Sequence, residues 1–365
     1  MNVEKFITSY LQNYTAYKTY WNYEDGCILM GCQQMYEATG DAYYRQFILD
    51  YLHTRIAEDG RIVNFLTEEY NTDDLNLSKV LFFAYQETGE ERFRKALDFS
   101  ASRLEKHPRC TCGSFWHKTI YPNQIWLDGL YMVQPFYMEY DTKLGKKEHY
   151  RDILTQFQNV RAFLFDEEKG LAYHGYDESR EQPWADKETG RSQNFWLRSL
   201  GWYAMALVDT ISLCDQQIYE VYAELKSDLK ALLQGLLRYQ DEASRLFYQV
   251  VDHPEAEGNY LETSGSAMVA YALLKGSRLG VISAERYQER GKEIMEALIA
   301  QKLTEADGQY HLNDICAVAG LGPGERRDGS IAYYLSEKIV SDDAKGVGPF
   351  IMAYAQYLLA ASDIK

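Results

Sequence analysis

SFWHKTIYPNQIWLDGLYMVQPFYM (Ser114–Met138) joins a polar, aromatic loop to a helix that is too apolar to face water. The loop contains Trp116, His117 and Lys118, and the helix begins near Asp128. A carboxylate at a helix start either caps free backbone N–H groups or has its proton affinity tuned for chemistry. Spacing alone favours a cap at Asp128, and only the recurrence of this arrangement along the chain favours chemistry.

The chain alternates between two kinds of helical segment. Segments of the first kind are charged and amphipathic, which is typical of helices with one face in water. Segments of the second kind are rich in Gly, Ala, Met and aromatic residues and poor in charge, so they must be buried on most sides. The amphipathic segments are expected near residues 2–17, 41–57, 91–106, 147–164, 218–238 and 284–302, and the apolar ones at 25–40, 75–89, 127–141, 198–212, 263–280 and 347–362.

Six such pairs predict an all-α fold, an (α/α)6 barrel that forms a single domain over residues 1–365. The apolar helices would form an inner ring and the amphipathic helices an outer ring. Glycines in EATGDAYY (37–44) and QETGEERF (86–93) are expected to end inner helices in the left-handed conformation. An open α-solenoid is the structural alternative. Extended sheet is not required, although residues 60–65 and 170–177 have the pattern of short hairpins.

The connections between the predicted helices are unequal in length. Those that lead from an outer helix into the next inner helix are long and aromatic, whereas the return turns are mostly short. The long connections should therefore gather at one end of the barrel, at the N-termini of the inner helices. Because helix N-termini carry partial positive charge and free N–H groups, a cleft there suits an anionic or hydroxyl-rich ligand.

The expected inner helices begin next to carboxylates, aromatic rings and basic side chains. Capping explains the carboxylates one by one, but it does not require the aromatic rings. Rings stack on sugar faces and carboxylates grip hydroxyls or move protons, so the combination predicts a saccharide site. The candidate site residues are Trp21, Tyr23, Asp73, Asp74, His117, Lys118, Trp126, Asp128, His174, Trp196, Arg198 and Trp202.

Charged residues in this set have two interpretations each. Arg198, placed between two tryptophans, either pairs with a nearby acid or forks onto a substrate carboxylate. Asp128 and one of Asp73 and Asp74 would share acid and base roles if they face one another across the cleft. His117 and His174 are weaker signals, because a histidine in a loop is more often a surface or hydrogen-bonding residue than a catalyst.

Composition excludes several classes of partner. A formal net charge of −16 argues against nucleic-acid binding, which needs a basic surface. The N-terminus lacks the order of a signal peptide, and no run is long enough to span a bilayer. Cys110 and Cys112 are too close for the usual zinc spacing, and no matching Cys or His pair follows them. The cysteines therefore predict reduced thiols in a cytoplasmic protein without a metal.

Several motifs together resemble those of a known family. They are NTDDLNLSK (71–79), SFWHK (114–118), QIWLDGLYM (124–132), FWLRSLGW (195–202), ETSGSAM (262–268), DGSIAYY (328–334) and SDDAKGVGPF (341–350). This set is similar to that of the unsaturated glucuronyl and rhamnogalacturonyl hydrolases, glycoside hydrolase families 88 and 105, with the closer resemblance to family 105. The resemblance extends from Trp21 to the last helix. One departure is the NLSK segment, where a Pro-Gly or Gly is expected before the basic residue.

The resemblance implies an (α/α)6 barrel and a reaction without a cofactor. The family's substrate is an oligosaccharide whose terminal uronic acid has a C4=C5 double bond. An acid protonates C4, water adds at C5, and the resulting hemiketal opens and releases the rest of the chain. By resemblance, Asp128 would be the general acid/base and Asp73, rather than Asp74, would assist. His117 and His174 would line the pocket, and Trp196, Arg198 and Trp202 would hold the unsaturated ring.

The predicted function is therefore an intracellular hydrolase of unsaturated uronyl oligosaccharides, with pectin-derived rhamnogalacturonan disaccharide as the expected substrate. Its partner would be a small oligosaccharide, and the protein would act as a monomer or homodimer. One alternative is a sugar epimerase on the same type of barrel, which would need two histidines deep in the inner helices. Another is a saccharide-binding protein without catalysis, which explains the aromatic rings but not the repeated carboxylates.

Overall fold

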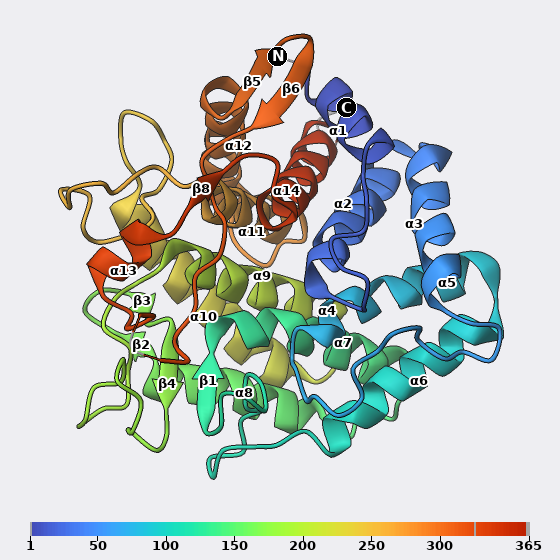
Figure 1. Ribbon diagram of the computed structural model, residues 1–365, viewed down its shortest axis with the longest axis horizontal. Coiled ribbons are helices and arrows are strands. Elements are labelled where there is room, and N and C mark those ends of the chain that lie inside the picture. The colour runs from blue at the N-terminus through green and yellow to red at the C-terminus, as the bar shows by residue number, and fades with distance from the viewer. Residues whose placement is uncertain (1, 325, 363–365) are drawn as a thin grey trace.

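The computed structural model describes residues 2–324 and 326–362, and its helices form an (α/α)6 barrel (Figure 1). The inner ring consists of α2 (Tyr23–Thr39), α4 (Asp74–Ser78) with α5 (Val80–Thr88), α7 (Leu127–Lys143), α9 (Leu197–Leu213), α11 (Thr263–Arg278) and α14 (Ala344–Ser362). Each packs against its neighbours, and α14 packs against both α11 and α2. This last contact closes the ring, so the open solenoid is excluded.

Glycine allows the inner helices to approach one another closely. A Cβ atom on Gly348 of α14 would lie 2.5 Å from the carbonyl oxygen of Cys27 in α2. On Gly265 of α11 it would lie 2.4 Å from Cγ of Leu197 in α9. Both distances are too short for real atoms, so the small residues of the inner helices are a condition of ring closure.

The outer helices cover the inner ring, as the amphipathic pattern predicts. Helix α3 packs on α2, α6 on α5, α8 on α7, α10 on α9, and α12 on both α11 and α14. Gly40 and Gly89 follow α2 and α5 with a φ of 70°, which confirms the predicted glycine stops. The outer helices are α1 (Val3–Gln12), α3 (Ala42–Arg55), α6 (Glu91–Glu105), α8 (Tyr150–Phe163), α10 (Tyr219–Leu236), which continues into η1 (Leu237–Tyr239), and α12 (Ala284–Gln301).

Short antiparallel strand pairs lie in the long connections. Strand β1 (Gln124–Trp126) pairs with β4 (Gly175–Asp177), and β2 (Phe165–Asp166) pairs with β3 (Leu171–Ala172). The expected hairpin at 170–177 is therefore wrong in its pairing, because β3 and β4 each pair with another strand. The expected hairpin at 60–65 is reduced to one bridge between Ile56 and Ile62. The remaining elements are β5 (Leu303–Ala306), β6 (Gln309–Leu312), β7 (Ile315–Cys316), β8 (Ile339–Val340) and α13 (Ile331–Ser336).

The β1–β4 pair matters most for the site. It joins the connection that enters α7 to the connection that precedes α9, with Trp126 opposite Gly175. The backbone N–H of Leu127 donates to the carbonyl of His174 at 3.1 Å. The first turn of α7 and the β3–β4 link are thereby held side by side. Over the part of the chain that the structure describes, none of the helices has the length and apolarity needed to cross a membrane.

Candidate active site

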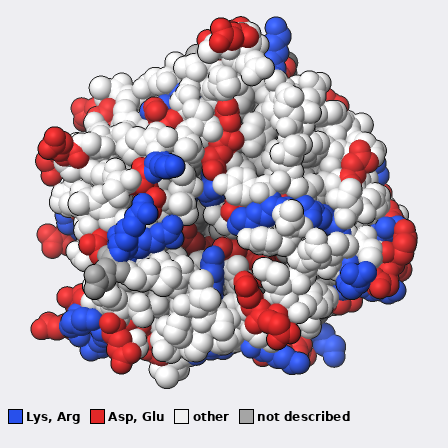
Figure 2. All heavy atoms as spheres, in the orientation of Figure 1, with Lys and Arg blue, Asp and Glu red and all other residues white. Residues whose placement is uncertain are grey.

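A cavity of about 390 Å³ opens where α2, α4 and α7 begin. Figure 2 shows a hollow near the middle of one face of the molecule, with acidic side chains in it and basic side chains around it. Three of the long connections contribute to the cavity, as do residues 318–320 and Arg327 of a fourth. It is lined by Lys18, Tyr20, Trp21, Asn22, Tyr23, Glu24, Leu66, Glu69, Asn71, Asp73, Asp74, His117, Lys118, Ile120, Tyr121, Trp126, Asp128, Met132, Val318, Ala319, Gly320 and Arg327.

Most of the candidate residues meet in this cavity, as expected from their positions at helix starts. Those that line it come from the first three inner helices and the connections that precede them. They are Trp21, Tyr23, Asp73, Asp74, His117, Lys118, Trp126 and Asp128.

Asp128 lies in the first turn of α7 but does not cap it. The N-cap residue is Trp126, which makes no capping bond with its side chain. The Asp128 side chain is 14% exposed, and its Oδ2 lies 3.2 Å from Nε2 of His174. Neither atom has a hydrogen bond of regular geometry within the described residues. Burial alone would raise the pKa of Asp128, but His174 and, more weakly, His117 outweigh burial and lower it, so the resting side chain is a carboxylate.

His174 supports Asp128 from behind the cavity wall. Its Nδ1 lies 2.8 Å from the hydroxyl of Tyr334 in α13, and its ring lies 4.8 Å from that of Trp196 between centroids. The side chain is fully buried and does not line the cavity. The prediction that His174 lines the pocket is therefore corrected: His174 contacts a residue that does.

His117 forms part of the aromatic wall. Its ring stacks on Trp126 with centroids 4.4 Å apart, and Tyr121 also stacks on Trp126, at 4.5 Å, with its centroid 6.1 Å from that of His117. The hydroxyl of Thr72 donates to the His117 carbonyl and lies 3.0 Å from Nδ1 of its ring. Burial lowers the pKa of His117 to about 3, so its imidazole is neutral. Stacked flat rings of this kind form a surface on which a sugar ring can pack.

Asp73 and Asp74 are adjacent in sequence but differ in their surroundings. Asp73 accepts a hydrogen bond from the ammonium of Lys118 at 2.5 Å. Burial raises the pKa of Asp74 well above its ordinary value, and the charge of Asp73 raises it further. The pKa values of two carboxyls in the cavity are therefore shifted in opposite directions, upward at Asp74 and downward at Asp128. Such divergence is typical of sites that divide acid and base roles.

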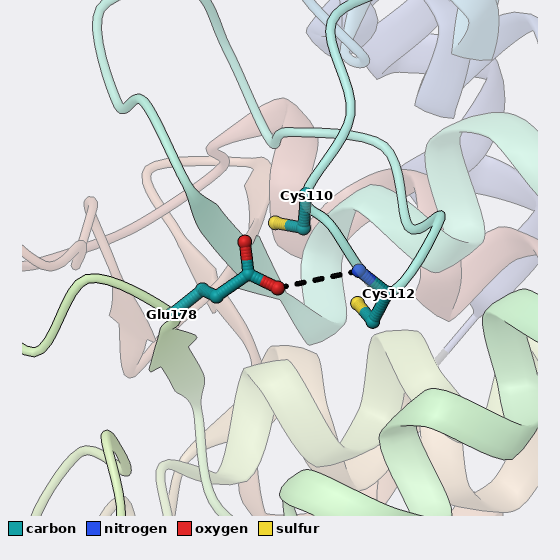
Figure 3. Close-up of side chains that lie close together, drawn as sticks. All are labelled: Cys110, Cys112 and Glu178. Carbon is teal, nitrogen blue, oxygen red and sulfur yellow. Dashed lines mark hydrogen bonds between the residues drawn. The ribbon is translucent and has the colours of Figure 1, made fainter.

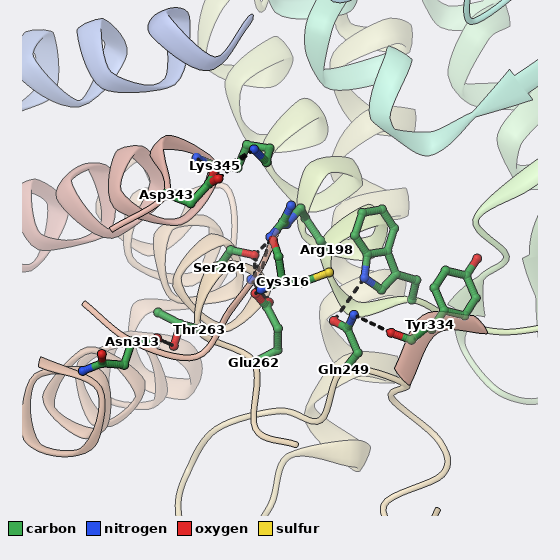
Figure 4. A network of polar contacts seen from close by, with 12 residues as sticks. Arg198, Gln249, Glu262, Thr263, Ser264, Asn313, Cys316, Tyr334, Asp343 and Lys345 are labelled. Carbon is green, nitrogen blue, oxygen red and sulfur yellow. Dashed lines mark hydrogen bonds and ion pairs between the residues drawn. The ribbon is translucent and has the colours of Figure 1, made fainter. Parts of the chain in front are cut away.

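Trp196, Arg198 and Trp202 do not line the cavity, contrary to the expectation that they hold the substrate ring. Arg198 is 1% exposed and donates from Nε to Ser264 at 2.7 Å and from Nη2 to the carbonyl of Cys316. Its Nη2 also lies 3.6 Å from Glu262, which accepts from Gly265 and Cys316 (Figure 4). Arg198 therefore binds groups of the protein itself. This agrees with the first of its two interpretations, pairing with a nearby acid.

The two tryptophans are equally enclosed. Trp196 donates from its indole nitrogen to Gln249 at 3.1 Å. Trp202 stacks on Tyr131 of α7 with centroids 4.8 Å apart. Position near a helix start predicted proximity to the cleft, but the side chains point elsewhere. Arg198 packs against α11, Trp202 packs against α7, and Trp196 packs against Gln249, His174 and Tyr334.

Some cavity residues carried no signal in the sequence. The basic ones are Lys18, which pairs with Glu24 at 2.8 Å, and Arg327, whose nearest carboxylate is Glu337 at 3.9 Å. The third basic residue, Lys118, forms a shorter ion pair, with 2.5 Å between its Nζ and Oδ2 of Asp73. Arg327 is therefore the basic side chain of the cavity with the longest ion-pair distance. It lies in an irregular segment where only the tertiary fold places it opposite α7.

Residues 2–361 match the family described as Glycosyl Hydrolase Family 88. A C. acetobutylicum glycoside hydrolase from family 105 is 45% identical with a TM-score of 0.93, over 98% of this chain and 99% of that chain. The unsaturated glucuronyl hydrolase from Bacillus sp. GL1 is 16% identical with a TM-score of 0.66, over 98% and 95%. A 24.9 kDa protein in the picA locus of Rhizobium radiobacter is 44% identical over 236 residues, 63% of this chain and 100% of that protein.

Proposed function

Because the chain belongs to glycosyl hydrolase family 88 and is a glycoside hydrolase, we propose that it removes a terminal 4,5-unsaturated uronic acid from a small oligosaccharide, with unsaturated rhamnogalacturonan disaccharide as the substrate. The observation that carries the proposal is the partly buried Asp128 carboxylate in a cavity walled by aromatic rings and edged by basic side chains. Such a site suits a sugar that is itself a carboxylate and that reacts by proton transfer.

The reaction is hydration of a vinyl ether, in which Asp128 first donates a proton and then accepts one. When the uronate carboxylate enters the cavity, its negative charge raises the pKa of Asp128 and favours protonation. Protonated Asp128 donates its proton to C4, which leaves positive charge on C5 and the ring oxygen. The carboxylate then takes a proton from the water that adds at C5. The hemiketal opens and the remaining sugar leaves, so Asp128 ends as it began and no cofactor is used.

Asp73 assists by charge in this proposal. Its carboxylate is held by Lys118, and an anion beside the cavity stabilises the oxocarbenium-like intermediate. Tyr121, Trp126 and His117 provide the surface for the sugar ring. The basic partner for the uronate carboxylate is Arg327, because its nearest carboxylate in the protein lies 3.9 Å away. The proposal places the enzyme in the cytoplasm, as a monomer or homodimer, and its cysteines are free thiols.

The test compares unsaturated galacturonyl-rhamnose, an unsaturated glucuronyl disaccharide and the saturated form of the first. Absorbance of the C4=C5 double bond and release of the second sugar are followed together. Hydration predicts that both signals change at one rate and that deuterium from D2O appears at C4. Release of sugar with the absorbance retained would indicate ordinary cleavage at the anomeric carbon. Isomerisation without either change would indicate an epimerase, and binding without turnover a saccharide-binding protein.

A further inference from the structure

Two thiols and a carboxylate meet away from the active-site cavity. Cys110 and Cys112 lie in the connection between α6 and β1, and Glu178 follows β4. One ligand atom from each residue lies within 4.8 Å of the other two (Figure 3). Within residues 2–324 and 326–362, this is the one group of three or more His, Cys, Asp or Glu residues close enough to share a metal ion.

A tight turn presents the two thiols together. The N–H of Cys110 donates to the carbonyl of Ser114 at 2.8 Å, and the N–H of Gly113 donates to the carbonyl of Cys110 at 2.9 Å. Gly113 has a φ of 91°, a conformation that glycine adopts without strain. The side chain of Asn159 in α8 donates to the carbonyl of Cys112 at 3.0 Å. The turn is therefore anchored at both cysteines before any ligand binds.

The carboxylate of Glu178 is oriented by the same turn. Its Oε2 accepts from the N–H of Thr111 at 2.8 Å, and its Oε1 accepts from the Thr111 hydroxyl at 2.8 Å and from the N–H of Cys112 at 3.3 Å. Ligating carboxylates are commonly fixed by hydrogen bonds of this kind. Because each carboxylate oxygen has two lone pairs, Oε2, which accepts a single bond, keeps one lone pair for a cation.

We propose that Cys110, Cys112 and Glu178 form a binding site for a divalent cation of the zinc class. Two thiolates and a carboxylate are zinc ligands, with ion-to-ligand distances of about 2.0–2.3 Å. Ligand atoms that already lie within 4.8 Å of each other reach that geometry by small side-chain rotations. A water molecule would complete a four-coordinate ion. Spacing along the chain hides this site, because Glu178 is 66 residues beyond Cys112, and the expectation of no metal considered only Cys and His partners.

The ion would have a structural role. It would link the connection before β1 to the segment after β4, next to the strand pair that positions Trp126 and His174. It takes no part in the hydrolysis, and the inference does not depend on the proposed substrate.

The experiment uses the full chain without an affinity tag, reduced and stripped with a chelator. Zn²⁺ is titrated against a competing chromophoric chelator, and Co²⁺ is added to a second sample. The expected results are one equivalent of Zn²⁺ bound, thiolate-to-cobalt charge-transfer bands, and a higher unfolding temperature with Zn²⁺. Absence of metal binding by the reduced protein would overturn the proposal, as would a Cys110–Cys112 disulfide that persists in reducing buffer.

Variants locate the site. Cys112→Ser and Glu178→Gln alter half-buried side chains and should fold, as circular dichroism would verify, and both should lose the bound equivalent. Thr111→Val should weaken Zn²⁺ binding about 10–100-fold, because it removes only a hydrogen bond to the ligating carboxylate. Cys214→Ser is the matched control, since Cys214 lies at the end of α9, and it should bind like the parent. Undiminished binding by the Cys110→Ser/Cys112→Ser double variant would contradict the site.

Discussion

Nε2 of His174 lies 3.2 Å from Oδ2 of Asp128, and Nδ1 of the same ring lies 2.8 Å from the hydroxyl of Tyr334. The three residues come from the β3–β4 link, α7 and α13, so the proton affinity of the proposed catalytic carboxylate depends on packing between distant segments.

His174→Gln should move the pH profile of kcat/KM. His174 lowers the pKa of Asp128 and burial raises it, so the pKa of Asp128 should rise when His174 is removed. The limb of the profile that belongs to Asp128 should therefore shift to higher pH. Tyr334→Phe keeps the imidazole and is the control, with a smaller shift. A limb that stays in place in His174→Gln would show that this histidine does not tune Asp128.

Asp128→Asn should reduce kcat by about 10²–10⁴-fold, the usual contribution of a general acid/base. The amide has the shape of the carboxyl but cannot cycle its proton. The measurement is loss of C4=C5 absorbance, together with the unfolding temperature to verify folding. Asp50→Asn, at an exposed position on α3, should behave like the parent. Parental turnover by Asp128→Asn would remove this residue from the mechanism.

Arg327→Met should raise KM by about 10–100-fold, because a hydrogen bond between charged groups contributes roughly 1.5–3 kcal/mol. The effect on kcat should be smaller if the contact is made equally in the bound and transition states. Initial rates over a range of substrate concentrations measure the split. The exposed neighbour Arg326, changed to Met, controls for loss of charge on the same segment, and equal KM values for both variants would refute the assignment.

Arg198→Met should destabilise the protein by about 3–5 kcal/mol, because it leaves the fully buried Glu262 without its cation. Urea unfolding measures the loss. Changing Glu262 to Met as well should recover part of it, since no uncompensated charge then remains. The opposite pattern, a stable Arg198→Met variant with a raised KM, would return Arg198 to the substrate site.

Lys79→Met should change the pH dependence of stability. The Lys79 ammonium lies 3.4 Å from the ring centroid of Tyr131 and donates to Asn76 and to the Tyr131 carbonyl. Burial lowers the pKa of Lys79 from 10.5 to about 7. Between those pH values the unfolded chain holds a proton that the folded chain has released, so folding becomes more favourable as pH rises.

The destabilisation caused by the buried charge is thus complete below pH 7 and fades towards pH 10.5. The stability of Lys79→Met relative to the parent should be highest below pH 7 and should decline across that window, by an amount on the order of a few kcal/mol. Urea unfolding of both proteins at several pH values gives the difference, in which titrations common to both cancel. A difference that is constant with pH would mean that Lys79 keeps an ordinary pKa.

The barrel could be predicted because its determinants are local and repeat. Alternating amphipathic and apolar segments decide which helices are buried, and glycines such as Gly40 and Gly89 end them through their own backbone freedom. Since long connections precede inner helices, chain order also predicts that Asp73 and Asp128 reach one end of the barrel, where the cavity is found.

The sequence did not predict the direction in which side chains point, nor their hydrogen-bond and ion-pair partners in distant segments. Arg198 lies at a helix start and Arg327 in an irregular segment, yet Arg198 is enclosed by Glu262 and Cys316 while Arg327 lines the cavity. His174 reaches Asp128 only through the β1–β4 pairing, and Glu178 meets Cys110 and Cys112 for the same reason. Periodicity determined which helices are buried in this protein, because hydrophobic burial depends on the face that a residue occupies. The site was decided by tertiary packing, because hydrogen bonds and ion pairs depend on distances of a few ångströms between segments far apart in the chain.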